Sequence, residues 1–325
     1  MSTNVLRTAD GWWVEQDGRA ARIETAATTT AALLADRPAV DAAAKRLERL
    51  DQEQSVPVPL LELLSPVTTP CRVVAQMVNY RSHARESGFD PSAVQPTFFR
   101  KASGSVVGPR APVVRPPHVR LLDYEVELGL VLGADLPAGA TVTDSDLPDL
   151  IAGLVLADDI SARDVQLTKG QFYESKSYPT FTPLGPRLAL LDAAEFAALA
   201  QLRLQLWVNG APRQDRTVAD MICPPARALT ALAGFQCLAA GDVLLTGTPG
   251  GTALQAPPKV VEKIAGLLPP HLKWRLFFDA QAKKDTYLRA GDRVTASIRT
   301  PDGRIDLGRQ DNLIVQAQPA PGVAR

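Results

Sequence analysis

The feature that most constrains the fold is a series of short apolar segments, from Cys71 onward, that glycine and proline separate. The clearest are DYEVELGLVLG, LRLQLWVNGAPRQ, GDVLLTGTP and GDRVTASIRTPDG. Runs of this length bounded by turn residues are typical of β-strands. Helices are expected to be fewer and peripheral, near residues 192–202 and 224–233. The sequence therefore predicts an α+β fold that is rich in β-structure, with a largely antiparallel sheet.

Turn dipeptides within this pattern predict hairpins. Asp17-Gly18, Asn209-Gly210 and Asp302-Gly303 each combine residues that tolerate positive φ. Tight primed turns need such residues, because their twist matches that of the flanking strands. We therefore expect a tight turn at each dipeptide.

The length of 325 residues exceeds what one ordinary core needs, so we expect more than one unit. Residues 1–67 are interpreted as a small N-terminal α+β unit, with strands around Asp17-Gly18 and an alanine-rich helix over about 41–51. A proline-dotted segment leads into a main domain over 68–318. Residues 319–325 are expected to form a flexible tail.

Composition excludes several classes of function. Lys plus Arg and Asp plus Glu both number 35, so no net charge attracts nucleic acid or an anionic membrane. The three cysteines lie far apart and form no CxxC pair, which argues against disulfides and zinc. No GxGxxG or GxxxxGK loop, signal peptide or membrane span is apparent, and a cytoplasmic location is expected by default.

An acidic strand is the first candidate functional motif. In DYEVE, side-chain alternation places Asp123, Glu125 and Glu127 on one face of a strand. Like charges so close need solvent or a cation, and Mg²⁺ takes oxygen ligands of this kind. The motif alone is equally compatible with a solvated strand face and with a metal site.

The second motif is LADDISARDVQ, in which an apolar strand ends at Asp158-Asp159. A strand ending in acids is a natural donor of metal ligands. The guanidinium fork of Arg163 could bind a substrate carboxylate, and Gln166 could contact neighbouring oxygens. Without other evidence, a helix-capping aspartate and a surface arginine would explain this motif better.

Seven segments, in order, resemble the signature segments of the fumarylacetoacetate hydrolase family. They are NYRSHARES, FFRK, DYEVELGLVLG, DDISARDVQ, SKSYPTFTPLGP, VNGAPRQDRTVADMI and GDVLLTGTPGG, and they span roughly residues 71–251. The resemblance implies a mixed β-sheet roll with peripheral helices, in which 68–318 is the catalytic domain. Residues 1–67 are only loosely covered by it.

The resemblance also implies the roles of individual residues. Glu125, Glu127 and Asp159 would be the metal ligands, with Asp123 behind them in a structural role. Lys176 would neutralise charge on an enolate oxygen. The predicted substrate contacts are Tyr80, Lys101, Arg163, Gln166, Thr246 and Thr248.

His83 and Glu86 lie three residues apart and would share one face of a helical turn. The resemblance implies a catalytic dyad on a mobile lid, with His83 as general base. Without the family context, a surface helix pair would be the simpler interpretation.

These features together predict an enzyme that uses Mg²⁺ or Mn²⁺ to cleave a carbon–carbon bond. The expected substrate is an acylpyruvate-like 2-oxo acid, cleaved through a stabilised enolate. Alternatives are a decarboxylase or isomerase on the same scaffold, and a metal-stabilised binding protein without catalysis. A homodimer is expected from the resemblance.

Several departures from the family pattern matter, and the largest of them, an insertion, leaves the acyl group open. VAQMVNY replaces the more usual glycine before NY, and this change and Asp158 could alter metal affinity or lid entry. Asp158 stands where asparagine is common, which adds negative charge near the cation. A stretch over about 253–288 forms an insertion next to the TGTP segment, where it could reshape the substrate pocket or extend an oligomer interface.

Overall fold

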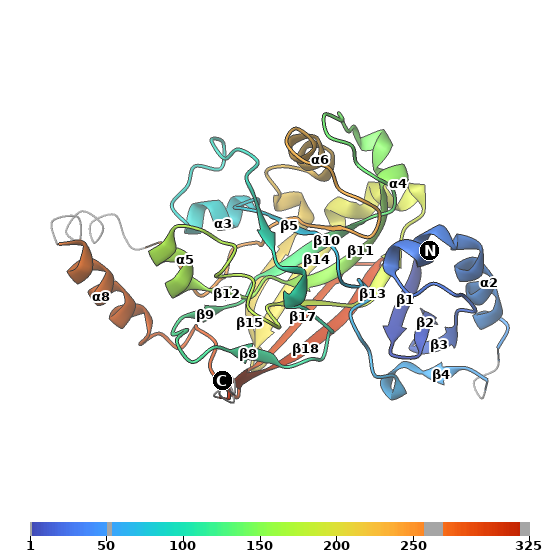
Figure 1. Ribbon diagram of the computed structural model, residues 1–325, viewed down its shortest axis with the longest axis horizontal. Coiled ribbons are helices and arrows are strands. Elements are labelled where there is room, and N and C mark those ends of the chain that lie inside the picture. The colour runs from blue at the N-terminus through green and yellow to red at the C-terminus, as the bar shows by residue number, and fades with distance from the viewer. Residues whose placement is uncertain (1, 51–53, 257–268, 319–325) are drawn as a thin grey trace, which may run out of the picture.

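A computed structural model describes residues 2–50, 54–256 and 269–318 (Figure 1). Its strands form three sheets, with helices at the periphery, so the predicted β-rich α+β class is confirmed. The predicted tail over 319–325 and the middle of the predicted insertion, 257–268, lie outside the described residues. None of the described helices combines the length and apolar character needed to cross a membrane.

The largest sheet has eleven strands and is mostly antiparallel, as predicted. Parallel pairing occurs between β16 and β5 and between β7 and β13. The order is β4 (Val56–Pro57), β3 (Arg19–Arg22), β2 (Gly11–Gln16), β1 (Thr3–Thr8), β13 (Thr182–Leu190), β11 (Ile151–Asp158), β10 (Val126–Leu132), β16 (Val243–Leu245), β5 (Val73–Gln76) and β6 (Phe98–Lys101), with β7 (Val106–Val107) beside β13.

A five-stranded sheet packs against one face of the large sheet. Its order is β15 (Ala211–Thr217), β14 (Arg203–Val208), β17 (Arg293–Arg299), β18 (Asp306–Gln316) and β8 (Val113–Arg115). Alternation along β10 points Leu128 and Leu130 into the shared core, where they join Leu206 and Ile298 of the smaller sheet. A short pair, β9 (Leu122–Asp123) and β12 (Ser161–Ala162), lies near the site described below.

The N-terminal strands continue the large sheet. β1 pairs with β13, with Val5 opposite Leu188, and helices α1 (Thr30–Ala35) and α2 (Arg37–Leu47) pack beside them. Their buried side chains share one apolar cluster with β11 and β13. The predicted unit boundary after residue 67 stays a prediction, but this segment is an extension of the main sheet rather than a sheet of its own.

The remaining helices surround the sheets. They are α3 (Arg81–Glu86), α4 (Leu147–Leu150), α5 (Arg163–Lys169), α6 (Pro225–Ala233) and α8 (Pro270–Gln281), with 3₁₀ turns η1 (Val58–Leu60), η2 (Ser103–Ser105), η3 (Asp144–Asp146), η4 (Ala193–Gln201) and η5 (Val218–Asp220). The expected helix near 192–202 is therefore 3₁₀. Helix α8, from the predicted insertion, extends outward beyond α5 (Figure 1).

Two of the three predicted primed turns are confirmed. Asp17 and Gly18 have φ values of 51° and 77°, and Asn209 and Gly210 have values of 52° and 79°. The third prediction is wrong: at Asp302-Gly303 only the glycine has a positive φ, and the connection runs from residue 300 to 305. The Asp302 carboxylate accepts hydrogen bonds from the Thr300 hydroxyl and the Arg304 amide, which stabilises this longer loop.

Close packing in the centre of the sheet leads to a stability prediction. A Cβ added at Gly153 of β11 would lie 2.5 Å from the backbone oxygen of Ala189. Gly153→Ala is expected to lower the free energy of unfolding by about 1–3 kcal/mol, because backbone atoms must move. Urea denaturation measures this. Gly104→Ala is the control, since a Cβ there meets nothing within 4 Å; equal effects would contradict the account.

Candidate metal centre and active site

Three carboxylates converge at one edge of the large sheet. Glu125 directly precedes β10, Glu127 lies in β10, and Asp159 directly follows β11. The two strands are antiparallel and pair Val126 with Asp158, so the start of one lies beside the end of the other. One oxygen of each of the three carboxylates lies within 4.8 Å of the others, and all three residues are buried.

Burial and neighbouring charges shift the pKa values of the carboxyl groups in this cluster. Burial, and then the carboxylates of Asp159 and Glu125, raise the pKa of Glu127 well above its usual range. Burial also opposes ionisation of Glu125, but Lys176 and Arg163 outweigh it and lower the pKa of Glu125 to about 2. Ionisation of Glu127 is therefore unfavourable without a further positive charge beside it, which a bound cation would supply.

Lys176 and Lys101 supply positive charge from two sides. The Lys176 ammonium donates to Glu125 at 2.6 Å and to Asp159 at 2.5 Å. The Lys101 ammonium donates to Asp159 and, at 3.0 Å, to the Phe181 carbonyl oxygen. Lys101 is fully engaged with the protein, so its position fits orientation of Asp159 rather than the predicted contact with substrate.

Arg163 is held in the same way. Its guanidinium donates to Asp123 at 2.8 Å, to Glu125 at 2.5 Å and to the Gln166 side-chain oxygen at 2.9 Å. Asp123 also accepts the backbone amides of Ala253 and Leu254. In this structure the guanidinium fork that was predicted to bind a substrate carboxylate instead orients Glu125, and Asp123 has the structural position expected for it.

The TGTP segment closes the site from the side of β16. The Gly247 amide donates to Glu127 at 2.8 Å, and the positive φ of 84° at Gly247 allows this approach. The Thr248 hydroxyl donates to the Val126 carbonyl oxygen and accepts from Gln214. The Thr246 hydroxyl donates to the Leu128 carbonyl oxygen, so Thr246 stabilises the strand pairing.

The donor set fits a hard divalent cation. Glu125, Glu127 and Asp159 offer carboxylate oxygens, which are the ligands that Mg²⁺ and Mn²⁺ prefer. Neighbouring lysine, arginine and backbone amide groups hold these carboxylates in place, as metal sites require. Three protein ligands leave further positions open for water and substrate oxygens.

A cavity of about 820 Å³ opens above the cluster. Of the predicted site residues, seven line it: His83, Glu125, Glu127, Arg163, Gln166, Lys176 and Thr248. Tyr80, Lys101 and Thr246 do not line it and are buried in the body behind it. This differs from the predicted substrate contacts, because these three side chains pack within the protein instead of facing the cavity.

Helix α3 lies over the cavity and carries the predicted dyad. His83 lines the cavity, and its Nδ1 has no hydrogen-bond partner within the part of the chain that the structure describes. Burial lowers the pKa of His83, which favours the neutral imidazole. The Glu86 carboxylate accepts the Gly251 amide at 2.7 Å instead of contacting His83, so it fastens α3 to the TGTPGG loop.

Several residues in and beside the cavity were not anticipated from the sequence. The Gln214 side chain accepts a hydrogen bond from the Val126 amide and donates to the Thr248 hydroxyl and the Pro249 carbonyl oxygen. The sequence predicted no specific role for this residue. The aromatic side chains Phe99, Phe172, Trp274 and Phe277 also line the cavity. No sequence pattern predicted that these four aromatic residues would lie near the carboxylate cluster, because they are distant from it along the chain.

The fold places a buried carboxylate cluster beside a cavity, and a comparison with known families identifies the class of protein. The family model described as fumarylacetoacetate (FAA) hydrolase C-terminal matches residues 72–315, and the chain belongs to this family. Its members are enzymes, so the predicted enzymatic class and the family resemblance are confirmed.

Named relatives within the family differ in reaction. The chain is 35% identical over 202 residues to the mitochondrial oxaloacetate tautomerase FAHD2A of Bos taurus, a match that spans 62% of each protein. The structure also resembles that of a probable 2-hydroxyhepta-2,4-diene-1,7-dioate isomerase from Mycobacterium abscessus, with a TM-score of 0.69 and 28% sequence identity. The superposition covers 98% of this chain and 100% of the isomerase chain.

A more distant structure shares the fold. Maleylpyruvate hydrolase from Sphingobium sp. SYK-6, solved with manganese(II) and pyruvate, gives a TM-score of 0.71 at 23% identity and covers 97% of this chain and 100% of its own. At this identity the likeness supports the architecture only.

Proposed function

We propose that the protein is a divalent-metal-dependent hydrolase that cleaves the carbon–carbon bond of an acylpyruvate-like 2-oxo acid. The observation that carries this proposal is a single cavity lined by Glu125, Glu127, Lys176 and His83, with an Asp159 carboxylate oxygen within 4.8 Å of an oxygen of each glutamate. Glu125, Glu127 and Asp159 would hold Mg²⁺ or Mn²⁺. The bound cation would supply Lewis-acid stabilisation to the carboxylate and keto oxygens of the substrate.

The residues of the chain would divide the remaining chemistry. Neutral His83 removes a proton from water as the water oxygen attacks the distal acyl carbonyl carbon. The bond between that carbon and C3 of the pyruvate unit then breaks, and its electron pair passes to pyruvate as an enolate. Lys176 stabilises the charge on the enolate oxygen, and protonation at C3 yields pyruvate and a carboxylic acid.

Gly250, which lies against Glu86 of α3, leads to a prediction for this mechanism. A Cβ at Gly250 would lie 2.5 Å from the Glu86 carboxylate. Gly250→Ala is expected to displace that flexible side chain, release α3 and lower kcat/KM by about 10-fold or more, with little change in stability. Steady-state turnover and thermal unfolding measure the two effects. Unchanged turnover would show that the Glu86 contact does not position His83.

Two related reactions are alternatives on the same site. The relatives named as an oxaloacetate tautomerase and a dioate isomerase suggest proton transfer without attack by water. Both would need a base such as His83 and an enolate stabilised beside Lys176. Decarboxylation of a 2-oxo acid would use the same enolate. We do not retain a non-catalytic role, because the family consists of enzymes.

Product analysis distinguishes these reactions. The protein would be incubated with Mn²⁺ and either an acylpyruvate or oxaloacetate, and the products followed by proton NMR. The proposal expects pyruvate and a carboxylic acid in equal amounts from the acylpyruvate. Accelerated keto–enol exchange of oxaloacetate without pyruvate from the acylpyruvate would favour the tautomerase. Pyruvate and carbon dioxide from oxaloacetate alone would favour the decarboxylase.

We also propose that the protein is a homodimer. The proposal rests on the family resemblance, and sedimentation equilibrium tests it: a mass of twice the chain supports a dimer, and a mass equal to the chain contradicts it.

A further inference from the structure

We infer that the outer part of the cavity selects substrates whose acyl group is large, apolar and uncharged, with Trp274 and Phe277 of α8 as specificity-determining residues. This inference rests on the proposed function, because it concerns the far end of the same substrate.

Charged groups gather at the inner end of the cavity. Apart from His83, the charged side chains among the described lining residues are Glu125, Glu127, Arg163 and Lys176. All four belong to the cluster described above. The Lys176 ammonium lies 5.1 Å from the centre of the Phe99 ring, which marks the transition from the charged end to an apolar wall.

Aromatic and aliphatic side chains form much of the rest of the wall, with the uncharged polar side chains of Gln76, Ser87, Gln255 and Gln281 among them. Phe99 meets Phe172 edge to face, with ring centres 5.3 Å apart. On α8, Trp274 meets Phe277 edge to face with ring centres 5.9 Å apart, and Leu276 also lines the cavity. Edge-to-face pairs of this kind present apolar surface to a ligand and hold one another in place.

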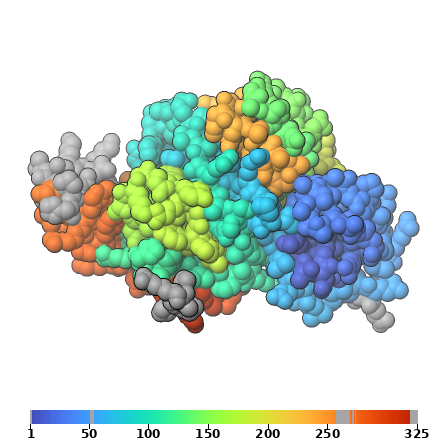
Figure 2. Space-filling model, in the orientation of Figure 1, coloured from blue at the N-terminus to red at the C-terminus, as the bar shows by residue number. Residues whose placement is uncertain are grey.

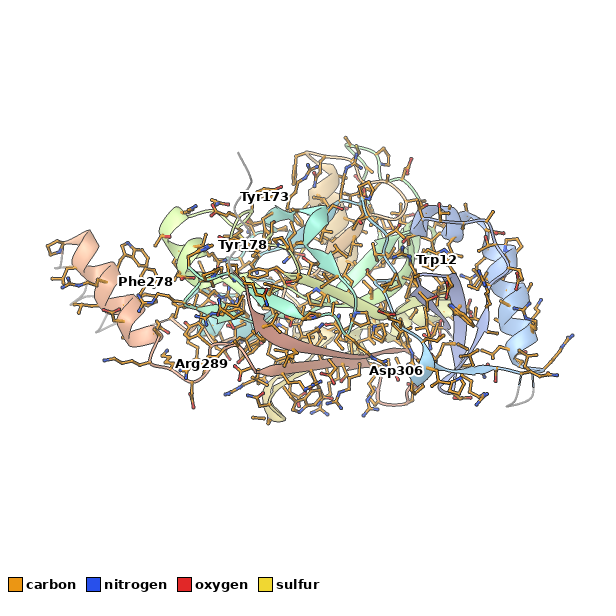
Figure 3. All side chains as sticks on the ribbon, turned by 60° about the horizontal axis from the view of Figure 1, so that its bottom comes forward. Trp12, Tyr173, Tyr178, Phe278, Arg289 and Asp306 are labelled. Carbon is orange, nitrogen blue, oxygen red and sulfur yellow. The ribbon has the colours of Figure 1, made fainter. Side chains whose placement is uncertain are left out.

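The C-terminal part of helix α8 is attached to the body, because Phe278 and Ala282 pack against the main core. The Phe278 ring also stacks on Trp274, with ring centres 5.4 Å apart. Figure 3 labels Phe278 on α8, at the left of that view. The chain after α8 returns to the body where Leu288 bridges to Leu122. Figure 2 shows the orange α8 residues beside the yellow-green surface around α5, which contributes Gln166 and Leu167 to the cavity.

Size and charge together indicate the class of acyl group. Cavities of roughly 300–1,000 Å³ hold drug-sized ligands, and a pyruvate unit of a few heavy atoms would leave much of 820 Å³ unfilled. The described part of the outer wall offers no lysine or arginine to a second carboxylate. A substrate with a carboxylate at its far end would leave that charge unpaired against aromatic rings, which is unfavourable.

The test is a series of acylpyruvates that differ only in the acyl group: acetyl, hexanoyl, benzoyl and a carboxylate-ended succinyl member. With Mn²⁺ present, kcat/KM for benzoyl- and hexanoylpyruvate should exceed that for acetylpyruvate by roughly 10-fold or more, and succinylpyruvate should be the poorest. Preference for succinylpyruvate over the apolar members would overturn the inference.

Variants of α8 assign the effect to the named residues. Trp274→Ala should lose most of the preference for benzoylpyruvate over acetylpyruvate, measured as the ratio of the two kcat/KM values. Phe277→Arg should reverse the preference toward succinylpyruvate. Arg275→Ala is the matched control, because this exposed neighbour on α8 does not line the cavity. Equal losses for every substrate in Trp274→Ala would contradict the assignment.

Measurements of ligand binding test this inference independently of the proposed reaction. Calorimetric titration of the Mn²⁺-loaded protein with the same four compounds needs no turnover. If no member releases pyruvate but benzoylpyruvate still binds more tightly than acetyl- and succinylpyruvate, the proposed hydrolysis fails and the inference stands. If affinity does not depend on the acyl group, the inference fails whatever the reaction.

Discussion

Glu127→Gln is expected to weaken Mn²⁺ binding by at least about 100-fold and to reduce turnover by a similar factor. Loss of groups that merely orient metal ligands costs 10–100-fold in affinity, so loss of a ligand should cost no less. Glutamine keeps an oxygen for the Gly247 amide, which is the contact the structure shows for this carboxylate. The fold should therefore persist, and the effect should belong to the metal.

Calorimetric titration with Mn²⁺ measures the affinity, and thermal unfolding with and without Mn²⁺ confirms it. The wild-type protein should be stabilised by about 2.7 kcal/mol when Mn²⁺ is 100 times its Kd, and the variant much less. Glu62→Gln, at an exposed glutamate of the N-terminal segment, is the matched control. If the Glu127→Gln variant binds Mn²⁺ as tightly as the wild-type protein, Glu127 is not a metal ligand.

His83→Ala is expected to lower kcat by about 100- to 10,000-fold, the usual contribution of a general base. The Mn²⁺ affinity should stay within about twofold, because the three proposed ligands are untouched. Arg85→Ala is the control, since Arg85 lies on the exposed side of the same helix. If kcat survives in His83→Ala, another group activates water, and the tautomerase alternative gains support.

The pH profile of the wild-type protein offers an independent check on His83. Burial lowers the pKa of the imidazole from its ordinary value near 6.5, so the group loses its proton at a lower pH than usual. A base must be unprotonated to act. The acidic limb of kcat/KM should therefore fall below pH 6.5 and should disappear in His83→Ala.

Strand patterns predicted the fold class because alternation and turn residues are local properties. The segment DYEVELGLVLG contains the end of β9 and all of β10, and its Glu125 and Glu127 both line the cavity. The approach of Asp159 to them required the pairing of β10 with β11, which neither motif contains. The family resemblance supplied that connection, and the geometry agrees with it.

Other features depend on contacts that no local pattern specifies. A motif can identify Lys101 and Arg163 as site residues, but their partners decide whether they face substrate or carboxylates. Lys101 is directed toward Asp159 by the Phe181 carbonyl oxygen, which lies 80 residues later in the chain. The aromatic wall of α8 depends similarly on how the insertion packs back onto the body.

The most direct test of the proposed site and reaction is reconstitution of metal-free protein. Protein treated with EDTA would be mixed with an acylpyruvate, and pyruvate release followed as Mn²⁺ is added. The account predicts negligible release without metal, with recovery that saturates as one Mn²⁺ binds per chain and that is absent in Glu127→Gln. Full release by the metal-free protein, or metal binding of wild-type strength in Glu127→Gln, would contradict it.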